Sequence, residues 1–140
     1  MKHKVFFDAS CILAALGSDN GGSFKLMRVL SESKHSIYTS EIALDEARRH
    51  LTKIKSSKRA LSLLTKKFKI VIIPAPKLQE VERCYKYTKD PDDAYLIASC
   101  FLKDCSHLVS LDKKHVLPVS AEVKRPKILT PGSFLRSLSK

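Results

Sequence analysis

The sequence contains no long apolar run. A membrane-spanning helix needs roughly 20 consecutive apolar residues, and the most apolar segment here, from Tyr95 to Leu102, is interrupted by Ser99 and bounded by charged residues. The apolar stretch that precedes Asp8 is also too short for a secretory signal. We therefore expect neither a membrane span nor a signal segment.

Paired cysteines are missing as well. The chain has four cysteines, none of them in a Cys-x-x-Cys pair, and its five histidines are dispersed, so we expect no zinc site. Cys11, Cys84 and Cys100 lie among apolar residues, where free thiols behave as small hydrophobic side chains. Reduced cysteines favour a cytoplasmic location.

Two phosphate-handling motifs are also absent. No glycine-rich loop is followed by lysine, which argues against a nucleoside triphosphate site. Ser10 stands where a phosphotransferase or phosphatase that uses Asp8 as a covalent nucleophile usually carries a second aspartate. Both classes of enzyme are therefore disfavoured.

Acidic residues are absent from residues 47–79, whereas lysines and arginines recur throughout that segment. With a net charge of +12 and a pI near 9.7, the surface attracts polyanions, and nucleic acid is the leading partner. The alternative is that the lysines only solvate the surface. The basic residues that flank the acids discussed below are the candidates for holding an RNA backbone: Arg48, Arg49, Lys53, Lys113 and Lys114.

Strands and helices are predicted to alternate along the chain. Its 140 residues, 44% of them hydrophobic, suit one folded domain over residues 1–140. Strands are predicted at residues 5–7, 36–39, 70–73, 108–110 and 127–129, with helices between them. This order predicts an α/β three-layer sandwich with a mostly parallel central sheet and helices on both faces.

Three local patterns give more detailed predictions. The β-branched run from Ile70 to Ile73 is typical of a buried parallel strand. Ser40 should cap a helix whose apolar stripe continues to Ile54. A further helical stripe is formed by Leu78, Val81 and Tyr85.

Three aspartates occupy positions at which such a sheet presents ligands, beyond the carboxyl ends of its strands. Asp8 and Asp112 each follow a predicted strand, and Asp93 begins an apolar helix. Each has a structural alternative: Asp8 as a helix N-cap, Asp112 as a turn residue, and the run from Asp90 as a helix start with Pro91 in its first turn. Asp90 and Asp93 should share a helical face, whereas Asp92 should point away.

A fourth acid, Glu46, lies on the helix that Ser40 is predicted to cap. It is offset from the apolar stripe and adjacent to Asp45, and exposed helical acids are usually only solvated. Glu41 is a further rival, although the helix dipole explains an acid in the first turn. The residues alone leave open which of these three acids faces a site.

Carboxylates gathered at one sheet edge repel one another, so their ionised forms call for a cation. Oxygen-only ligands suit Mg²⁺ or Mn²⁺. Such a metal can activate a water molecule for in-line attack on a phosphodiester bond. Together with the basic surface, this chemistry predicts metal-dependent cleavage of RNA.

The order and spacing of these motifs resemble the PIN domain family, metal-dependent ribonucleases that include the toxins of many prokaryotic toxin–antitoxin pairs. The resemblance covers nearly the whole chain and rests on five segments: Val5–Ser10, Ser40–Glu46, Asp90–Ala98, Leu108–Asp112 and Ile128–Leu135. Ala94 departs from it, because many relatives carry a charged residue at that position.

The resemblance implies that Asp8, Glu46, Asp93 and Asp112 are the catalytic, metal-binding acids, and it adds Ser10, Ser110 and Asp90 as accessory residues. It also implies an RNA substrate and Mg²⁺ or Mn²⁺ as cofactor, and it allows an antitoxin partner and a homodimer. The role is then that of a toxin or of a stand-alone RNA-processing nuclease. The alternative is a non-catalytic RNA-binding module in which the acids serve only as caps.

Overall fold

The centre of the protein is a sheet of five parallel strands. A computed structural model describes residues 2–139, and the strands are ordered β3-β2-β1-β4-β5. Their bounds are β1 (Lys4–Phe7), β2 (Ser36–Ser40), β3 (Val71–Ile73), β4 (His107–Val109) and β5 (Lys127–Leu129). The chain passes outward through β2 and β3 and then returns to β4, so the strand order reverses beside β1.

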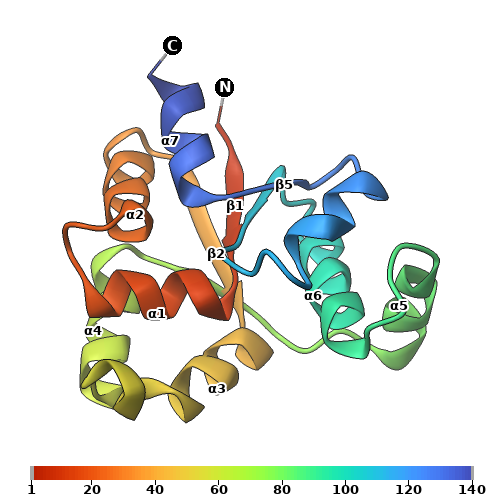
Figure 1. Cartoon of the computed structure of the whole chain (residues 1–140), viewed down its shortest axis with the longest axis horizontal. Helices are drawn as coiled ribbons and strands as arrows, with labels where there is room; N and C mark the ends of the chain where they lie inside the picture. Colours follow the sequence, from red (N-terminus) through yellow and green to blue (C-terminus); the bar gives the residue numbers. More distant parts are fainter. Residues whose placement is uncertain (1, 140) are drawn as a thin grey trace.

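Helices cover both faces of this sheet (Figure 1). One face carries α1 (Ala9–Gly17), α2 (Gly22–Glu32), α3 (Glu41–Arg49), α4 (Lys58–Lys67) and α7 (Pro131–Leu138), with the 3₁₀-helix η1 (Leu51–Ile54) after α3. The other face carries α5 (Leu78–Glu82) and α6 (Pro91–Leu102), with the 3₁₀-helices η2 (Arg83–Lys86) and η3 (Leu117–Ala121). The predicted three-layer α/β sandwich is confirmed.

The central strands are apolar on both faces because each face is covered. Along β1, Val5 and Phe7 belong to the core under α1 and α2, whereas Phe6 belongs to the core under α6. All three side chains are fully buried. Alternate residues of a strand point to opposite faces, so a continuous apolar run is what a strand between two helical layers requires.

The run predicted to be a buried strand forms an edge strand instead. β3 pairs with β2 alone, and Val71 and Ile72 are each 43% exposed, while Ile73 is fully buried. A β-branched run looks the same for a central and for an edge strand. The crossover connections place β3 last, and local sequence does not encode them.

Two predicted helices end earlier than their apolar stripes. The helix capped by Ser40 stops at Arg49 and continues only as η1, and α5 gives way to η2 after Glu82. A 3₁₀-helix has about 3.0 residues per turn instead of 3.6, which rotates later side chains away from the original stripe. Accordingly Tyr85 is 42% exposed. Leu78, in the first turn of α5, is 66% exposed, which the later 3₁₀-helix does not explain.

Two predicted helix caps are confirmed. Ser40 caps α3 by accepting from the Ala43 amide at 3.0 Å, and Asp90 caps α6 with Pro91 in its first turn. All four cysteines are free and buried. None of the helices found between residues 2 and 139 combines the length and the apolarity required to cross a membrane.

Candidate active site

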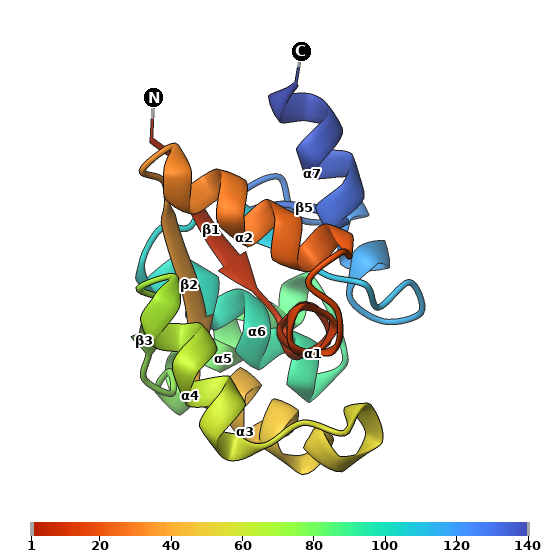
Figure 2. The same cartoon turned by 90° about the vertical axis from the view of Figure 1, so that its left-hand side faces the viewer.

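A pocket of about 430 Å³ opens at the carboxyl edge of the sheet. Ligands of parallel sheets bind at such edges where the strand order reverses, which here is beside β1 and β4. Figure 2, which looks along α1, shows β1 pointing toward the start of that helix. The pocket is lined by Asp8, Ala9, Ser10, Ser40, Ile42, Ala43, Glu46, Arg49, Asp90, Asp92, Asp93, Tyr95, Leu96, Ser99, Asp112, His115 and Val116.

Asp8 lines this pocket from the junction between β1 and α1 and is only 5% exposed. As the N-cap of α1, its Oδ1 accepts from the Cys11 amide at 3.0 Å and from the Ser10 hydroxyl at 2.5 Å. Its Oδ2 accepts from the Ser110 hydroxyl. Burial raises the pKa of Asp8, although these hydrogen bonds oppose the shift. The N-cap position thus also places a carboxylate in the pocket.

Ser10 and Ser110 join the start of α1 to the loop after β4. The Ser10 Oγ accepts from the Leu111 amide at 3.0 Å, and the Ser110 Oγ accepts from the Asp112 amide, also at 3.0 Å. Each serine also donates to Asp8. The two hydroxyls therefore couple the position of Asp8 to the backbone that carries Asp112.

Asp112 both forms a turn and lines the pocket. Its Oδ1 accepts from the amides of Lys114 at 3.1 Å and His115 at 2.9 Å, which is the turn geometry that its sequence position suggests. Its Oδ2 lies 3.5 Å from the Nδ1 of His115. The turn leaves this second oxygen available to a ligand or to His115.

The start of α6 brings further acids to the pocket. Asp93 is 7% exposed, and burial together with the charges of Asp90 and Asp112 raises its pKa to about 6. Asp90 holds this turn in place by accepting from the Asp92 amide at 2.8 Å and the Asp93 amide at 3.3 Å. The prediction that Asp92 points away is wrong, since Asp92 is exposed but also lines the pocket.

The structure separates the three acids of α3. Glu46 lines the pocket, whereas Glu41 and Asp45 do not. Asp45 pairs instead with Arg48, whose Nη1 is 2.6 Å from its Oδ1, on an exposed surface. Desolvation raises the pKa of Glu46, and the charges of Asp8 and Asp92 raise it further. Glu46 is therefore the acid of this helix that could act with Asp8.

The donor set of the pocket suits a hard divalent cation. Its acids offer carboxylate oxygens, and the raised pKa values of Asp8, Glu46 and Asp93 show that negative charge is unfavourable there until it is neutralised. Within residues 2–139, no three acidic, histidine or cysteine side chains already converge as a metal centre requires. The chemistry of the residues nevertheless fits Mg²⁺ or Mn²⁺.

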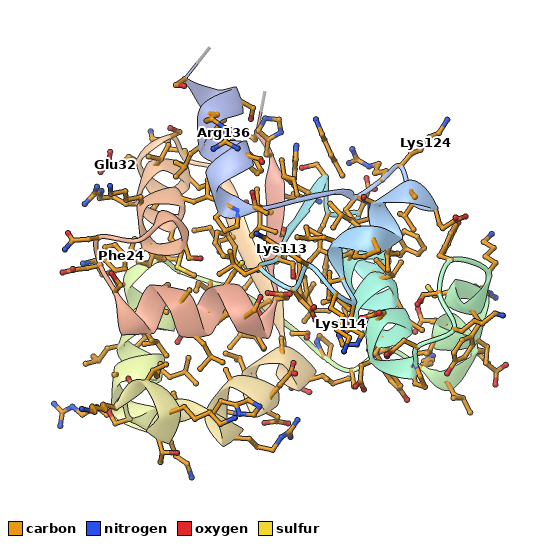
Figure 3. The ribbon with its side chains drawn as sticks, in the orientation of Figure 1. Phe24, Glu32, Lys113, Lys114, Lys124 and Arg136 are labelled. Atoms are coloured by element: carbon orange, nitrogen blue, oxygen red, sulfur yellow. The ribbon has the colours of Figure 1, made fainter. Side chains whose placement is uncertain are left out.

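Only one of the predicted RNA contacts lines the pocket itself. Arg49 does so from α3, whereas Arg48, Lys53, Lys113 and Lys114 are exposed around it or farther along the surface. Figure 3 labels Lys113 and Lys114, which follow Asp112 in the loop after β4. Arg48 is already engaged by Asp45, which weakens its case as an RNA contact.

Sequence reasoning overlooked several pocket residues. Among them are His115, beside Asp112, and the apolar side chains of Ile42, Tyr95 and Leu96. Helical spacing could have found two of these, since Tyr95 and Leu96 stand three residues after Asp92 and Asp93. The same spacing links Ile42 to Glu46, which follows it by four residues on α3, but only the fold brings α3 to α6.

Comparisons with known proteins agree with this architecture. The family model described as PIN domain matches residues 4–114. The crystal structure of PAE2754 from Pyrobaculum aerophilum is similar at a TM-score of 0.67 and 16% identity, covering 99% of this chain and 91% of that one. VapC20 of Mycobacterium tuberculosis, a toxin that cleaves the sarcin–ricin loop, is similar at a TM-score of 0.57 and 19% identity, covering 84% and 94%.

At these identities the two solved structures establish a shared fold. No functionally curated protein matches the sequence. The family match is independent of the structural likeness and spans most of the chain. On that ground, the chain belongs to the PIN domain family.

Proposed function

We propose that this protein is a metal-dependent endoribonuclease that hydrolyses RNA phosphodiester bonds. One observation carries the proposal: Asp8, Glu46, Asp93 and Asp112 come from four separate segments and line one pocket at the point where the strand order reverses. Membership of the PIN domain family supports it, because PIN domains are generally ribonucleases. The similarity to VapC20, which is a toxin that cleaves the sarcin–ricin loop, supports an RNA substrate.

In this proposal the four acids hold Mg²⁺ or Mn²⁺. When bound, the metal supplies a water activated for in-line attack and neutralises charge on the phosphate oxygens. Ser10 and Ser110 each donate a hydroxyl hydrogen bond to Asp8. These hydrogen bonds fix the orientation of its carboxylate and stabilise the ionised form. Asp90 fixes the first turn of α6 and thereby the place of Asp93.

Basic side chains hold the RNA backbone beside the pocket. Arg49 lines the pocket next to Glu46 and can contact a phosphate there. Lys113 and Lys114 are exposed directly after Asp112, and the net charge of +12 attracts RNA before any specific contact forms. Lys53 extends this surface along η1, whereas Arg48 on α3 is already paired with Asp45 and is the weaker candidate.

We place the protein in the cytoplasm, either as the toxin of a toxin–antitoxin pair or as a stand-alone RNA-processing nuclease. An antitoxin and a second copy of the chain are the proposed protein partners. Purification of the native protein from its host at physiological salt tests this choice. A stoichiometric small partner supports the toxin, and a free monomer or homodimer supports the processing enzyme.

The nuclease proposal is tested by incubating the purified protein with RNA and Mn²⁺. Asp93→Asn and Glu46→Gln should each lower the cleavage rate by more than about 100-fold, since even residues that only orient metal ligands contribute 10–100-fold. Asp45→Asn is the matched control for Glu46→Gln, because Asp45 is adjacent but does not line the pocket. Equal cleavage by wild type and Asp93→Asn would refute the assignment of Asp93 to the active site. Binding without metal-dependent cleavage would favour the non-catalytic module.

A further inference from the structure

One wall of the acidic pocket is apolar. Ile42 from α3, and Tyr95 and Leu96 from α6, line the same pocket as the acids. Ile42 is 37% exposed, and the two α6 side chains are partly exposed. A metal ion and a phosphate group gain nothing from apolar side chains. Tyr95 and Leu96 also pack against the core under α6, but phosphodiester hydrolysis gives no role to the parts of these side chains that face the pocket.

The apolar side chains adjoin the acids in a regular way. Tyr95 follows Asp92 by three residues and Leu96 follows Asp93 by three, so acids and apolar side chains occupy successive turns on one side of α6. On α3, Ile42 precedes Glu46 by four residues, one turn away. A nucleotide whose phosphate reaches the acids therefore places its next chemical group against this wall.

The pocket has room for such a group. A cation with six water-sized ligands takes up roughly 180 Å³, at about 30 Å³ for each water. The pocket measures about 430 Å³. More than half of it remains for another part of the substrate, and ligand pockets of about 300–1,000 Å³ commonly enclose organic groups.

We propose that Tyr95, Leu96 and Ile42 form a nucleobase subsite, in which an unstacked base next to the scissile phosphate packs against the Tyr95 ring. The inference rests on the proposed nuclease function and adds the part of the substrate that the acids do not recognise. The faces of nucleobases are π surfaces that stack on aromatic side chains, and this contact tolerates any base. Tyr95 is thus a binding residue that positions the phosphodiester over the acids.

The test measures binding without catalysis. Protein carrying Asp93→Asn is titrated in EDTA and low salt with a short single-stranded RNA of alternating uridine and 2-aminopurine, whose fluorescence falls on stacking. We expect quenching, and a dissociation constant that rises about 5- to 150-fold when Tyr95→Ala is added, from the 1–3 kcal/mol that stacking contributes per base. Tyr95→Phe should bind like the parent. Tyr85→Ala, which removes an exposed tyrosine outside the pocket, is the matched control.

A second RNA, with abasic sites in place of 2-aminopurine, separates base contacts from backbone contacts. The parent protein should bind it as weakly as Tyr95→Ala binds the intact RNA. Equal binding of intact and abasic RNA by the parent overturns the subsite without requiring any variant to fold. Should Tyr95→Ala lower the melting temperature, Tyr95→Leu keeps apolar packing and removes only the ring. Loss of Mn²⁺-dependent cleavage is a separate readout, and it bears on the nuclease proposal alone.

Discussion

Without a metal, the repulsion and burial of the pocket acids should make the protein less stable than it would be without them, and Asp93 is one of the acids whose pKa is raised. Its pKa is raised from 3.8 to about 6 by burial and by the charges of Asp90 and Asp112. A group that binds its proton more tightly in the folded state destabilises the fold once it is ionised. Asp93→Asn should therefore stabilise the protein at pH 8 in EDTA.

The size of this stabilisation follows from how far the pKa of Asp93 is raised. About two pKa units, at 1.36 kcal/mol each, give an upper limit of about 3 kcal/mol. Solvent at the open mouth of the pocket screens the repulsion, so we discount this figure. Asn also gives up a favourable interaction of about 0.3–1 kcal/mol between the anion and the start of α6. We expect a net gain of about 1 kcal/mol.

The difference in stability between wild type and Asp93→Asn should depend on pH in a defined direction. Between pH 4 and 6 the folded wild type holds more protons than the unfolded chain, so this contribution to stability falls as pH rises through that window. The advantage of Asp93→Asn is therefore complete above pH 6 and disappears near pH 4. Urea unfolding of both proteins across this range measures it, with Asp45→Asn as an exposed control.

Addition of Mn²⁺ should make the wild type more stable than Asp93→Asn. A ligand that binds only the folded state stabilises it by RT ln(1 + [L]/Kd), so the wild type gains more than a variant that lacks one carboxylate. If Asp93→Asn proves equal or less stable at pH 8 in EDTA, or if its advantage does not change with pH, the account of charge repulsion in the pocket is refuted.

Two further predictions concern the supports of the site and the opposite edge of the sheet. Ser110→Ala removes a hydroxyl that donates to the buried Asp8, which should lower the free energy of unfolding by about 1–3 kcal/mol in chemical denaturation and weaken Mn²⁺-dependent cleavage; Ser62→Ala, at an exposed serine of α4, is the comparison. His107 has a pKa lowered to about 4 by burial and by nearby positive charges, so stability should be lost as pH falls from 6.5 to 4. After screening we expect this loss to be about 1–2 kcal/mol and absent in His107→Gln; an unchanged acid transition in that variant would show that His107 is not responsible.

Local chemistry was sufficient to predict the elements and several of their ends. Asp8 follows β1 and caps α1, Asp90 caps α6, and Ser40 caps α3, because capping depends on one side chain and the next few amides. The alternation of apolar segments likewise predicted a parallel sheet between two helical layers. These features depend on neighbours in the sequence, and for that reason one sequence is enough to find them.

The pocket itself was decided by tertiary structure. Glu46 could be told from Asp45 only when α3 was packed against the sheet beside Asp8, since the two acids differ by one position on one helix. The edge position of β3, and the presence of Ile42 and Tyr95 in one pocket, also depend on how crossovers place distant segments together. The sequence determined which side chains stand at the ends of strands and helices, because those rules are local, whereas long-range packing decided which of them share a pocket.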